Sequence, residues 1–238
     1  MSSKGTLYMI PCTLGDIDPM QVLPISVKNT IHQLDEFIVE NSKTARAFLK
    51  KMEIPIPQSE LKLHILNKRT EEAELTGFLK SCENGKSIGL ISEAGCPGVA
   101  DPGAEVVHMA HQRGIKVIPL VGPSSILLAL MGSGMSGQSF SFHGYIPIDR
   151  SDRKKKLKEL ERLSIQHKQT QLFIETPYRN DKMFEDLLQV LNPRTMLCVA
   201  CELTLDSQEL KTLSAGQWKK TKKPNLHKRP SIFLIYNA

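Results

Sequence analysis

The sequence predicts two α/β domains, the first built on a doubly wound, mostly parallel sheet. Short apolar runs alternate with helical patterns through the first half of the chain. A stretch rich in glycine and serine at residues 122–137 then interrupts this alternation. A length of 238 residues suits one large domain or two small ones. We expect two, an N-terminal α/β domain over 1–121 and a basic α+β domain over 122–238.

Short apolar runs in the first half are the expected strands. They lie at residues 7–10, 37–39, 63–66, 87–91 and 116–120. Helical signals stand between them. Acidic Glu71, Glu72 and Glu74 follow Thr70 in a first turn, and Gly114 ends a helix over 104–113. Strands that alternate with helices in this way predict parallel pairing.

The second half begins with a very apolar helix over 126–131, which the glycines of 132–137 close. Later strands are expected at residues 140–146, 171–175, 195–201 and 232–236. A basic helix is expected to begin at a Ser151 cap, and another helix to cover 183–191. Residues 211–230 show little periodicity, which predicts a mobile connection.

The composition, 40% apolar and 24% charged, is that of an ordinary globular protein rather than a disordered one. The apolar run over residues 6–10 stops at Pro11, too short for a signal peptide or a membrane span. We therefore expect a cytoplasmic protein that does not bind a membrane.

Positive charge is concentrated in the second half. Residues 1–121 carry 13 Lys and Arg against 14 Asp and Glu, whereas the remainder carries 18 against 11. Two runs, 150–168 and 211–229, hold most of the excess. Such a face attracts partners rich in phosphate or carboxylate, with RNA the expected one, although a solvated surface that only aids solubility explains either run alone.

The five cysteines are odd in number and scattered, which favours free thiols over a disulfide framework. Cys198 and Cys201 have metal-site spacing but lie in an apolar run without a second pair, so buried strand positions are expected. His108 and His111 are expected on the surface of a helix. We predict no metal site.

Three loops that follow predicted strands are candidates for a ligand site, because ligands of doubly wound sheets bind beyond the carboxyl ends of the strands. They cover residues 11–16, 92–103 and 122–125. The second contains three glycines and two prolines, which fix an irregular backbone and allow close approach to a ligand. None carries a dinucleotide or P-loop motif. A purely structural loop remains the alternative for each one alone.

Six segments in order resemble the tetrapyrrole-methylase superfamily and, within it, the branch of 16S rRNA cytidine 2′-O-methyltransferases. The segments are Leu7-Tyr8-Met9-Ile10-Pro11 with Gly15-Asp16, Ile91-Ser92-Glu93-Ala94-Gly95-Cys96-Pro97 with Asp101-Pro102-Gly103, Pro119-Leu120-Val121-Gly122-Pro123-Ser124, Phe142-His143-Gly144-Tyr145-Ile146-Pro147, Ile174-Glu175-Thr176-Pro177-Tyr178-Arg179 and Glu202-Leu203-Thr204. The resemblance covers almost the whole chain.

This resemblance implies a homodimer that binds S-adenosylmethionine in the cleft between two domains and uses it to methylate a substrate. By motif position, the cofactor-binding residues are Leu14, Gly15, Ala94, Gly95, Cys96, Val99, Ser124, Ser125, Glu175 and Leu203. The candidates for catalysis are Asp101, Glu175 and Glu202 as proton acceptors and Arg179 as a phosphate ligand.

Methyl transfer from a sulfonium needs alignment and no general acid, because the leaving group is a neutral thioether. This accounts for the lack of a catalytic triad motif. A ribose 2′-hydroxyl must still lose a proton to a base. For each of the carboxylates named above, a structural ion pair or strand-end hydrogen bond is the competing explanation.

The resemblance breaks at segments expected to touch the substrate. Glu40-Asn41-Ser42-Lys43 replaces the Glu-Asp-Thr-Arg of the rRNA branch, residues 67–71 replace His-x-His-Asn-Glu, Glu93 replaces Asp, and Lys228-Arg229-Pro230 replaces Lys-Gly-Glu. Two further hypotheses therefore stay open. One is a methyltransferase of a tetrapyrrole or another small acidic substrate, and the other is an RNA-binding relic without turnover.

Overall fold

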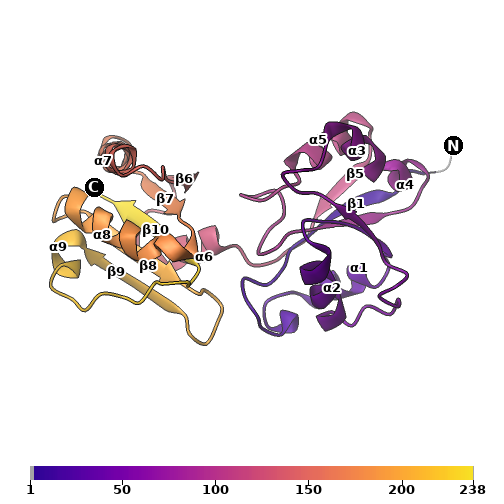
Figure 1. Cartoon of the computed structure of the whole chain (residues 1–238), viewed down its shortest axis with the longest axis horizontal. Helices are drawn as coiled ribbons and strands as arrows, with labels where there is room; N and C mark the ends of the chain where they lie inside the picture. Colours follow the sequence, from indigo (N-terminus) through magenta and orange to yellow (C-terminus); the bar gives the residue numbers. More distant parts are fainter. Residues whose placement is uncertain (1–2, 238) are drawn as a thin grey trace. The chain divides into compact units, whose positions relative to one another are not determined.

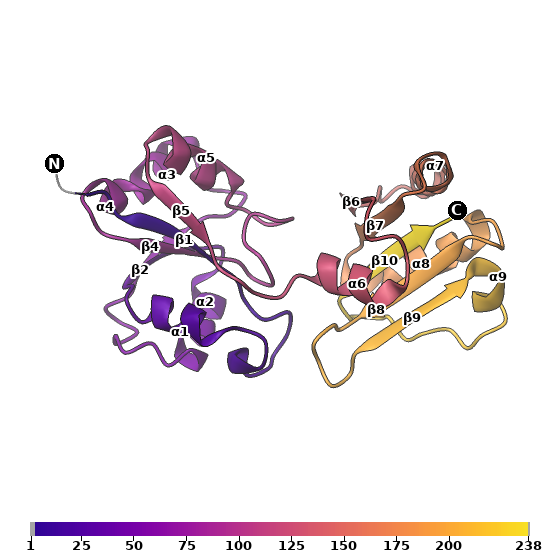
Figure 2. The same cartoon turned by 180° about the vertical axis from the view of Figure 1, so that it is seen from behind.

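The computed structural model describes residues 3–237. Contacts divide the chain into two compact units, Met1–Ser124 (unit 1) and Ser125–Ala238 (unit 2). This division lies three residues after the junction expected from the sequence. Figures 1 and 2 show the elements of each unit from opposite sides.

Unit 1 contains a parallel sheet with strand order β3-β2-β4-β1-β5. The doubly wound, parallel fold predicted for the first half is confirmed. Its strands are β1 (Thr6–Ile10), β2 (Glu36–Val39), β3 (Lys62–Ile65), β4 (Ile88–Ile91) and β5 (Lys116–Pro119). Its helices are η1 (Pro19–Gln21), α1 (Ile25–Ile31), α2 (Ser42–Lys51), α3 (Glu72–Phe78), α4 (Lys80–Glu83) and α5 (Ala104–Gln112).

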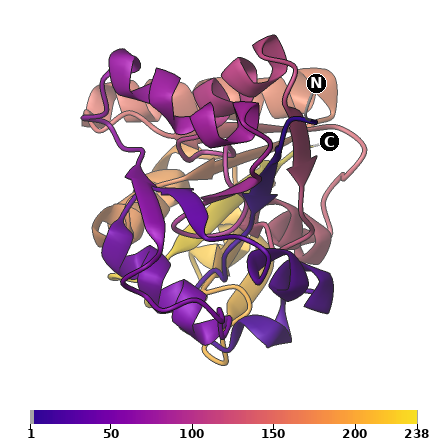
Figure 3. The same cartoon turned by 90° about the vertical axis from the view of Figure 1, so that its right-hand side faces the viewer.

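Both faces of this sheet are covered by helices (Figure 3). Successive strand side chains point to opposite faces, so Phe37 and Val39 of β2 pack with α1 and α2. Ile38 between them packs with α3, α4 and α5 on the other face. Burial on both sides explains why the central strands β1, β2 and β4 are short, mostly apolar runs rather than alternating ones.

Asn41 caps the N-terminus of α2, where its side-chain oxygen accepts a hydrogen bond of 2.8 Å from the backbone N–H of Lys43. This position is occupied by Asp in the Glu-Asp-Thr-Arg segment of the rRNA branch. Asp and Asn are both strong N-cap residues. The replacement of Asp by Asn therefore preserves the N-cap of α2, although it removes a negative charge.

Unit 2 contains a mixed sheet with strand order β6-β7-β10-β8-β9, in which only β6 and β7 pair in parallel. Its strands are β6 (Phe140–Tyr145), β7 (Thr170–Ile174), β8 (Met196–Cys201), β9 (Glu209–Ser214) and β10 (Ser231–Tyr236). Its helices are α6 (Ser125–Ser133), α7 (Arg150–His167), η2 (Pro177–Arg179), α8 (Asn180–Val190) and α9 (Ala215–Trp218).

The main core of unit 2 lies between one face of this sheet and helices α7, α8 and α9. Phe173 and Phe233 stack at a centroid distance of 5.9 Å, and Phe184 meets Trp218 edge to face. Helix α6 contacts β8, β9 and β10.

Two details of the second half predicted from the sequence are wrong. Helix α7 begins at Arg150, because the carboxylate of Asp149 accepts hydrogen bonds from the N–H groups of Ser151 and Asp152 and so acts as the cap. The connection expected over 211–230 also contains regular structure, since β9 extends to Ser214 and α9 follows it.

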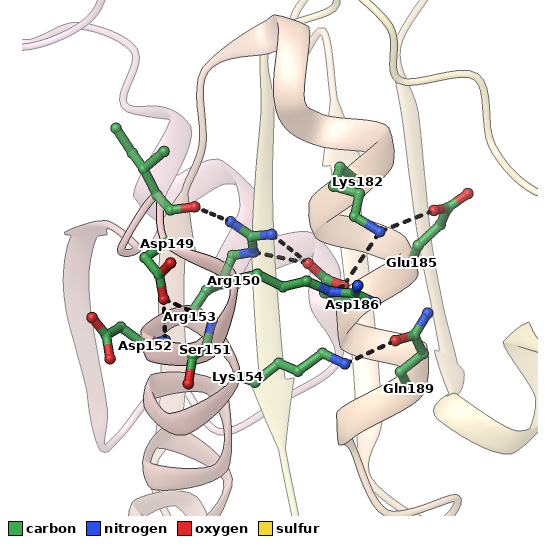
Figure 4. Close-up of polar contacts among 11 residues, drawn as sticks. Asp149, Arg150, Ser151, Asp152, Arg153, Lys154, Lys182, Glu185, Asp186 and Gln189 are labelled. Carbon is green, nitrogen blue, oxygen red and sulfur yellow. Dashed lines mark hydrogen bonds and ion pairs between the residues drawn. The ribbon is translucent and has the colours of Figure 1, made fainter.

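Asp186 on α8 fixes the position of α7 through a buried polar cluster (Figure 4). Its carboxylate is 0% exposed and accepts hydrogen bonds of 2.9 and 2.6 Å from Nε and Nη2 of Arg153. Arg153 also donates to the carbonyl of Ile148, and Lys182 lies 3.6 Å from the other oxygen of Asp186. One basic residue of the 150–168 run therefore points into the protein and is not part of its charged surface.

Cys198 and Cys201 are buried on β8, and His108 and His111 are exposed on α5, as predicted. All five cysteines are free thiols. No helix within residues 3–237 combines the length and the apolar character of a membrane span.

Candidate active site

The loops after β1 and β4 leave the sheet at its topological switch point. These strands are neighbours, and their carboxyl ends lie at the same edge because they are parallel. The chain then passes to α1 on one face after β1 and to α5 on the other face after β4. A doubly wound sheet binds its ligands at such a point.

Backbone hydrogen bonds join these two loops directly. The N–H of Cys12 donates to the carbonyl of Gly95 over 2.9 Å, and the N–H of Gly95 donates to the carbonyl of Cys12 over 3.2 Å. The hydroxyl of Ser92 also donates to the carbonyl of Gly95, at 2.7 Å. The glycine-rich loop is therefore held in one conformation at its centre.

The third loop packs against the same point. Gly95 has φ +70°, and a Cβ atom on it would lie 3.2 Å from Leu14 and 3.4 Å from the carbonyl oxygen of Pro123. Gly122 approaches Pro11 so closely that a Cβ atom there would lie 2.3 Å from its ring. Loops 11–16, 92–103 and 122–125, chosen from composition alone, thus meet at one edge of the sheet of unit 1.

The predicted cofactor-binding residues of unit 1 form a partly open surface at this edge. Val99 is 49% exposed, Ala94 is exposed, and Leu14, Gly15, Cys96 and Ser124 are half-buried. The thiol of Cys96 lies 3.4 Å from the carbonyl oxygen of Pro123. Small side chains and accessible backbone are what a site that uses backbone groups requires.

Two carboxyl groups near this edge, those of Asp101 and Glu40, have raised pKa values. Burial, together with the nearby charges of Glu40 and Glu93, raises the pKa of Asp101 to about 6. Burial and Glu93 likewise raise the pKa of Glu40. A small cavity lies beside Glu40, Ser92 and Asp101. A carboxyl group with a pKa near 6 can accept a proton at neutral pH.

Burial, followed by the charges of Glu93 and Asp101, also strongly raises the pKa of the Cys12 thiol. Cys12 is therefore a neutral structural residue and not a nucleophile. In the described part of the chain, no group of three or more His, Cys, Asp or Glu side chains is arranged to hold a metal ion.

The candidate carboxylates of unit 2 are tied into ion pairs. Glu175, buried just after β7, accepts hydrogen bonds of 2.6 Å from Nη2 of Arg179 and from the backbone N–H of Thr176. Glu202, just after β8, accepts a 2.8 Å hydrogen bond from Nε of Arg229. The Ser207 hydroxyl and Arg229 hold the pKa of Glu202 below its usual value.

Glu175 and Glu202 lie at the same edge of the sheet of unit 2, because β7 and β8 both run antiparallel to β10. The backbone of Glu202 has φ +48°, and its N–H donates to the carbonyl of Pro230. Leu203 is buried beside it, and Ser125 is the first residue of α6.

The comparison with known families decides the classification. A family model described as Tetrapyrrole (Corrin/Porphyrin) Methylases matches residues 7–217. The chain belongs to the tetrapyrrole methylase family. The resemblance found in the sequence is confirmed.

This tetrapyrrole methylase is similar to curated relatives named Ribosomal RNA small subunit methyltransferase I. It is 31% identical to the protein of Vibrio cholerae over 198 residues, which cover 83% of this chain and 65% of the relative. It is also 31% identical to the protein of Bacillus subtilis over 208 residues, which cover 87% and 67%. The chain thus spans about two thirds of the length of these relatives.

Solved structures of other methyltransferases share the fold of this tetrapyrrole methylase. The methyltransferase CobJ matches with a TM-score of 0.64 at 16% identity, covering 98% of this chain and 95% of that one. The cobalt precorrin-4 methyltransferase CbiF matches with a TM-score of 0.62 at 14% identity, covering 97% and 94%. The predicted α/β fold class is confirmed.

Two residues that the sequence did not single out as cofactor-binding or catalytic lie at the candidate site. Pro123 supplies a carbonyl oxygen near Gly95 and Cys96, and Glu40 raises the pKa of Asp101 from a different strand end. Glu40 follows β2 in the sequence, at the edge where ligands bind, so its position was a usable signal. The contact of Cys12 with Gly95 gives no such signal, because 83 residues separate them.

Proposed function

We propose that this tetrapyrrole methylase transfers a methyl group from S-adenosylmethionine to a ribose 2′-hydroxyl of RNA. The observation that carries the proposal is the meeting of three loops at the switch point of unit 1, within a chain that matches the family model over residues 7–217. The relatives that the chain matches at 31% identity are named for ribosomal RNA methylation.

The loop edge of unit 1 fits the methyl donor. Leu14 and Val99 offer apolar surface to the adenosine moiety, and the glycines allow the ligand to approach the backbone. Glu40, Glu93 and Asp101 create a negative potential, which favours the positively charged sulfonium and amino groups. In unit 2, Ser125, Glu175 and Leu203 complete the proposed set of cofactor-binding residues.

When bound, S-adenosylmethionine supplies an electrophilic methyl group on a good leaving group. The acceptor oxygen would bond to the methyl carbon while the carbon–sulfur bond broke, and the bonding pair would remain on sulfur. The hydroxyl proton passes to a base. We assign that role to Asp101, whose raised pKa keeps it a usable acceptor near neutral pH.

Glu175, Arg179 and Glu202 suit a positioning role better than proton transfer. Arg179 is occupied by Glu175, and Glu202 is a weak base because Ser207 and Arg229 lower its pKa. Their ion pairs fix the strand ends of unit 2 on which the proposed cofactor contacts depend. A direct catalytic role for these three residues stays a prediction.

We also propose that the protein acts in the cytoplasm as a homodimer. Leu127 and Met131 lie one turn apart on α6 and are 52% and 79% exposed. Exposed apolar side chains on one helical face suit a protein interface. Sedimentation measured with the purified chain tests the dimer, and a monomer at micromolar concentration would contradict it.

Ribosomal RNA from a strain that lacks the gene is the test substrate for the proposed activity. We expect the purified protein to transfer radiolabelled methyl groups to this RNA, and nucleoside mass spectrometry to detect a new 2′-O-methyl nucleoside. Methylation of a porphyrinogen instead would favour the tetrapyrrole reading. Binding of RNA without any methyl transfer would favour an RNA-binding protein that has lost catalytic turnover.

A further inference from the structure

A second cavity opens within unit 2, beside strands β8 and β9. It has a volume of about 320 Å³ and is lined in part by residues 222–226, which follow α9. This volume is at the small end of pockets that hold small molecules, roughly 300–1,000 Å³. None of the predicted cofactor or catalytic residues lines it.

Lysines dominate the charge around this cavity. Lys211 of β9 and Lys222 and Lys223 of the segment after α9 line it and are exposed, and Glu209 is the one acidic residue among its described lining. The carboxylate of Glu209 accepts a 2.6 Å hydrogen bond from Nη1 of Arg229, which also pairs with Glu202, so the charge of Glu209 is partly balanced and three lysines outnumber it. The cavity therefore presents a net positive potential.

The lysines differ in how far they are already neutralised. Lys223 lies 3.1 Å from the carboxylate of Glu185. Within residues 3–237, neither Lys211 nor Lys222 has a carboxylate within 4.0 Å. These two ammonium groups are free to bind an anion that enters the cavity.

Trp218 gives the cavity a fixed floor. Its indole N–H donates a 2.8 Å hydrogen bond to the carbonyl of Leu197, and its ring packs edge to face against Phe184. The ammonium of Lys211 lies 5.5 Å from the centre of the Trp218 ring, within the range of a cation–π contact. This contact holds one cationic group at the cavity before any ligand arrives.

We propose that this cavity binds a phosphate group of the RNA strand on which the enzyme acts. The inference rests on the proposed function, because it takes RNA as the substrate. Lysine binds phosphate as a point charge, and the pocket has room for one nucleotide. The proposal gives a binding role to lysines of the basic run 211–229. Arg229, in the same run, instead pairs with Glu202 and Glu209.

Binding of a single-stranded RNA oligonucleotide, measured by anisotropy at several salt concentrations, tests the pocket. The variant is Lys211→Gln/Lys222→Gln. The matched control is Lys50→Gln/Lys116→Gln, which removes two exposed charges in unit 1. We expect about tenfold weaker binding for the pocket variant and a salt slope smaller by roughly 0.7, the value for one lost phosphate contact on a single strand. Lys211→Arg/Lys222→Arg should retain binding.

Trp218 is the only tryptophan of the chain and locates the binding event. Saturating RNA should change its fluorescence in the wild type, and adenosine monophosphate should compete. An equal loss of RNA binding in pocket and control variants, or an unchanged Trp218 signal, would overturn the proposal. Tight binding of a free nucleotide that RNA does not displace would also overturn the proposal. Binding of polyglutamate with the same affinity as RNA would overturn it too.

Calorimetry with S-adenosylmethionine on the same variants separates this inference from the proposed function. Unchanged donor binding beside weakened RNA binding is the expected pair of results. If the wild type binds no donor and transfers no methyl group, the proposed function fails while the RNA measurement still tests the pocket.

Discussion

Asp101 in unit 1 and Glu202 in unit 2 both follow the end of a buried strand, yet their surroundings act on them in opposite directions. Burial together with Glu40 and Glu93 raises the pKa of Asp101 to about 6. The Ser207 hydroxyl and Arg229 hold the pKa of Glu202 below its ordinary value. Carboxylates that are equal candidates in the sequence therefore differ in their capacity to accept a proton.

The same contrast holds between Glu93 at the loop edge and two acids of unit 2, whereas acids of unit 1 away from this edge also form ion pairs. Glu93 meets the hydroxyl of Thr44 at 2.6 Å, whereas Glu175 pairs with Arg179 and Asp186 pairs with Arg153. Like charges left close together store unfavourable energy, and proteins retain such arrangements at functional sites. Unit 1 thus carries the chemistry that we propose, and the ion pairs of unit 2 carry structure.

The largest expected effect is the loss of activity in Asp101→Asn. The amide cannot accept the hydroxyl proton, so we expect kcat to fall by about 10²–10⁴-fold. Methyl transfer to RNA under single-turnover conditions measures this, with Asp206→Asn, an exposed residue of unit 2, as the control. Activity within a few fold of the wild type would remove Asp101 from the mechanism.

Asp186→Ala should have the largest effect on stability. It leaves the buried guanidinium of Arg153 without its partner, which costs about 3–5 kcal/mol in the free energy of unfolding. Urea denaturation measures this loss. Glu185→Ala removes a neighbouring, partly exposed acid of the same helix and should cost far less stability, because solvent screens its ion pairs. Similar losses in both variants would contradict a special role for the buried pair.

Asp101→Asn should also stabilise the fold above pH 6. Because the folded-state pKa is raised, protonated Asp101 favours folding at low pH, and this contribution is lost as the pH rises through about 6. The group is partly exposed, so solvent screening limits the gain in the variant to about 1 kcal/mol. Thermal unfolding at pH 8 and at pH 4 should show the gain only at pH 8, and a variant less stable at pH 8 would contradict it.

The smallest expected effect is a shift of the pH profile in Glu93→Gln. In the wild type, activity should rise with pH through about 6 and then level off, as Asp101 loses its proton. Removal of one like charge lowers the pKa of Asp101, so the midpoint should move to lower pH by a fraction of a unit. Glu105→Gln, an exposed change on α5, should leave the midpoint in place. A shift to higher pH would refute the electrostatic account.

The sequence predicted the central strands of unit 1 well, because burial on both faces makes β1, β2 and β4 mostly apolar. Strand β9 escaped prediction, since an edge strand that pairs only with β8 has polar side chains such as Glu209 and Lys211. The N-cap of α7 was misplaced by two residues, at Ser151 instead of Asp149, because both are good caps.

The candidate site was likewise predicted only in part. Composition found the three loops, because tight turns and close approach require glycine and proline locally. It could not rank the carboxylates, since the pKa of Asp101 depends on Glu40 and the binding of Glu202 depends on Arg229. Contacts between residues 27 or more positions apart leave no local pattern.

Titration calorimetry with S-adenosylmethionine on two glycine variants tests the central claim, that the methyl donor binds at the loop edge of unit 1. Gly95→Ala and Gly134→Ala replace glycines of nearly equal φ, +70° and +71°, but only at Gly95 does a Cβ atom meet Leu14 and Pro123. We predict that Gly95→Ala weakens donor binding by about tenfold or more while Gly134→Ala retains it. Equal donor affinity in the wild type and both variants would contradict the claim.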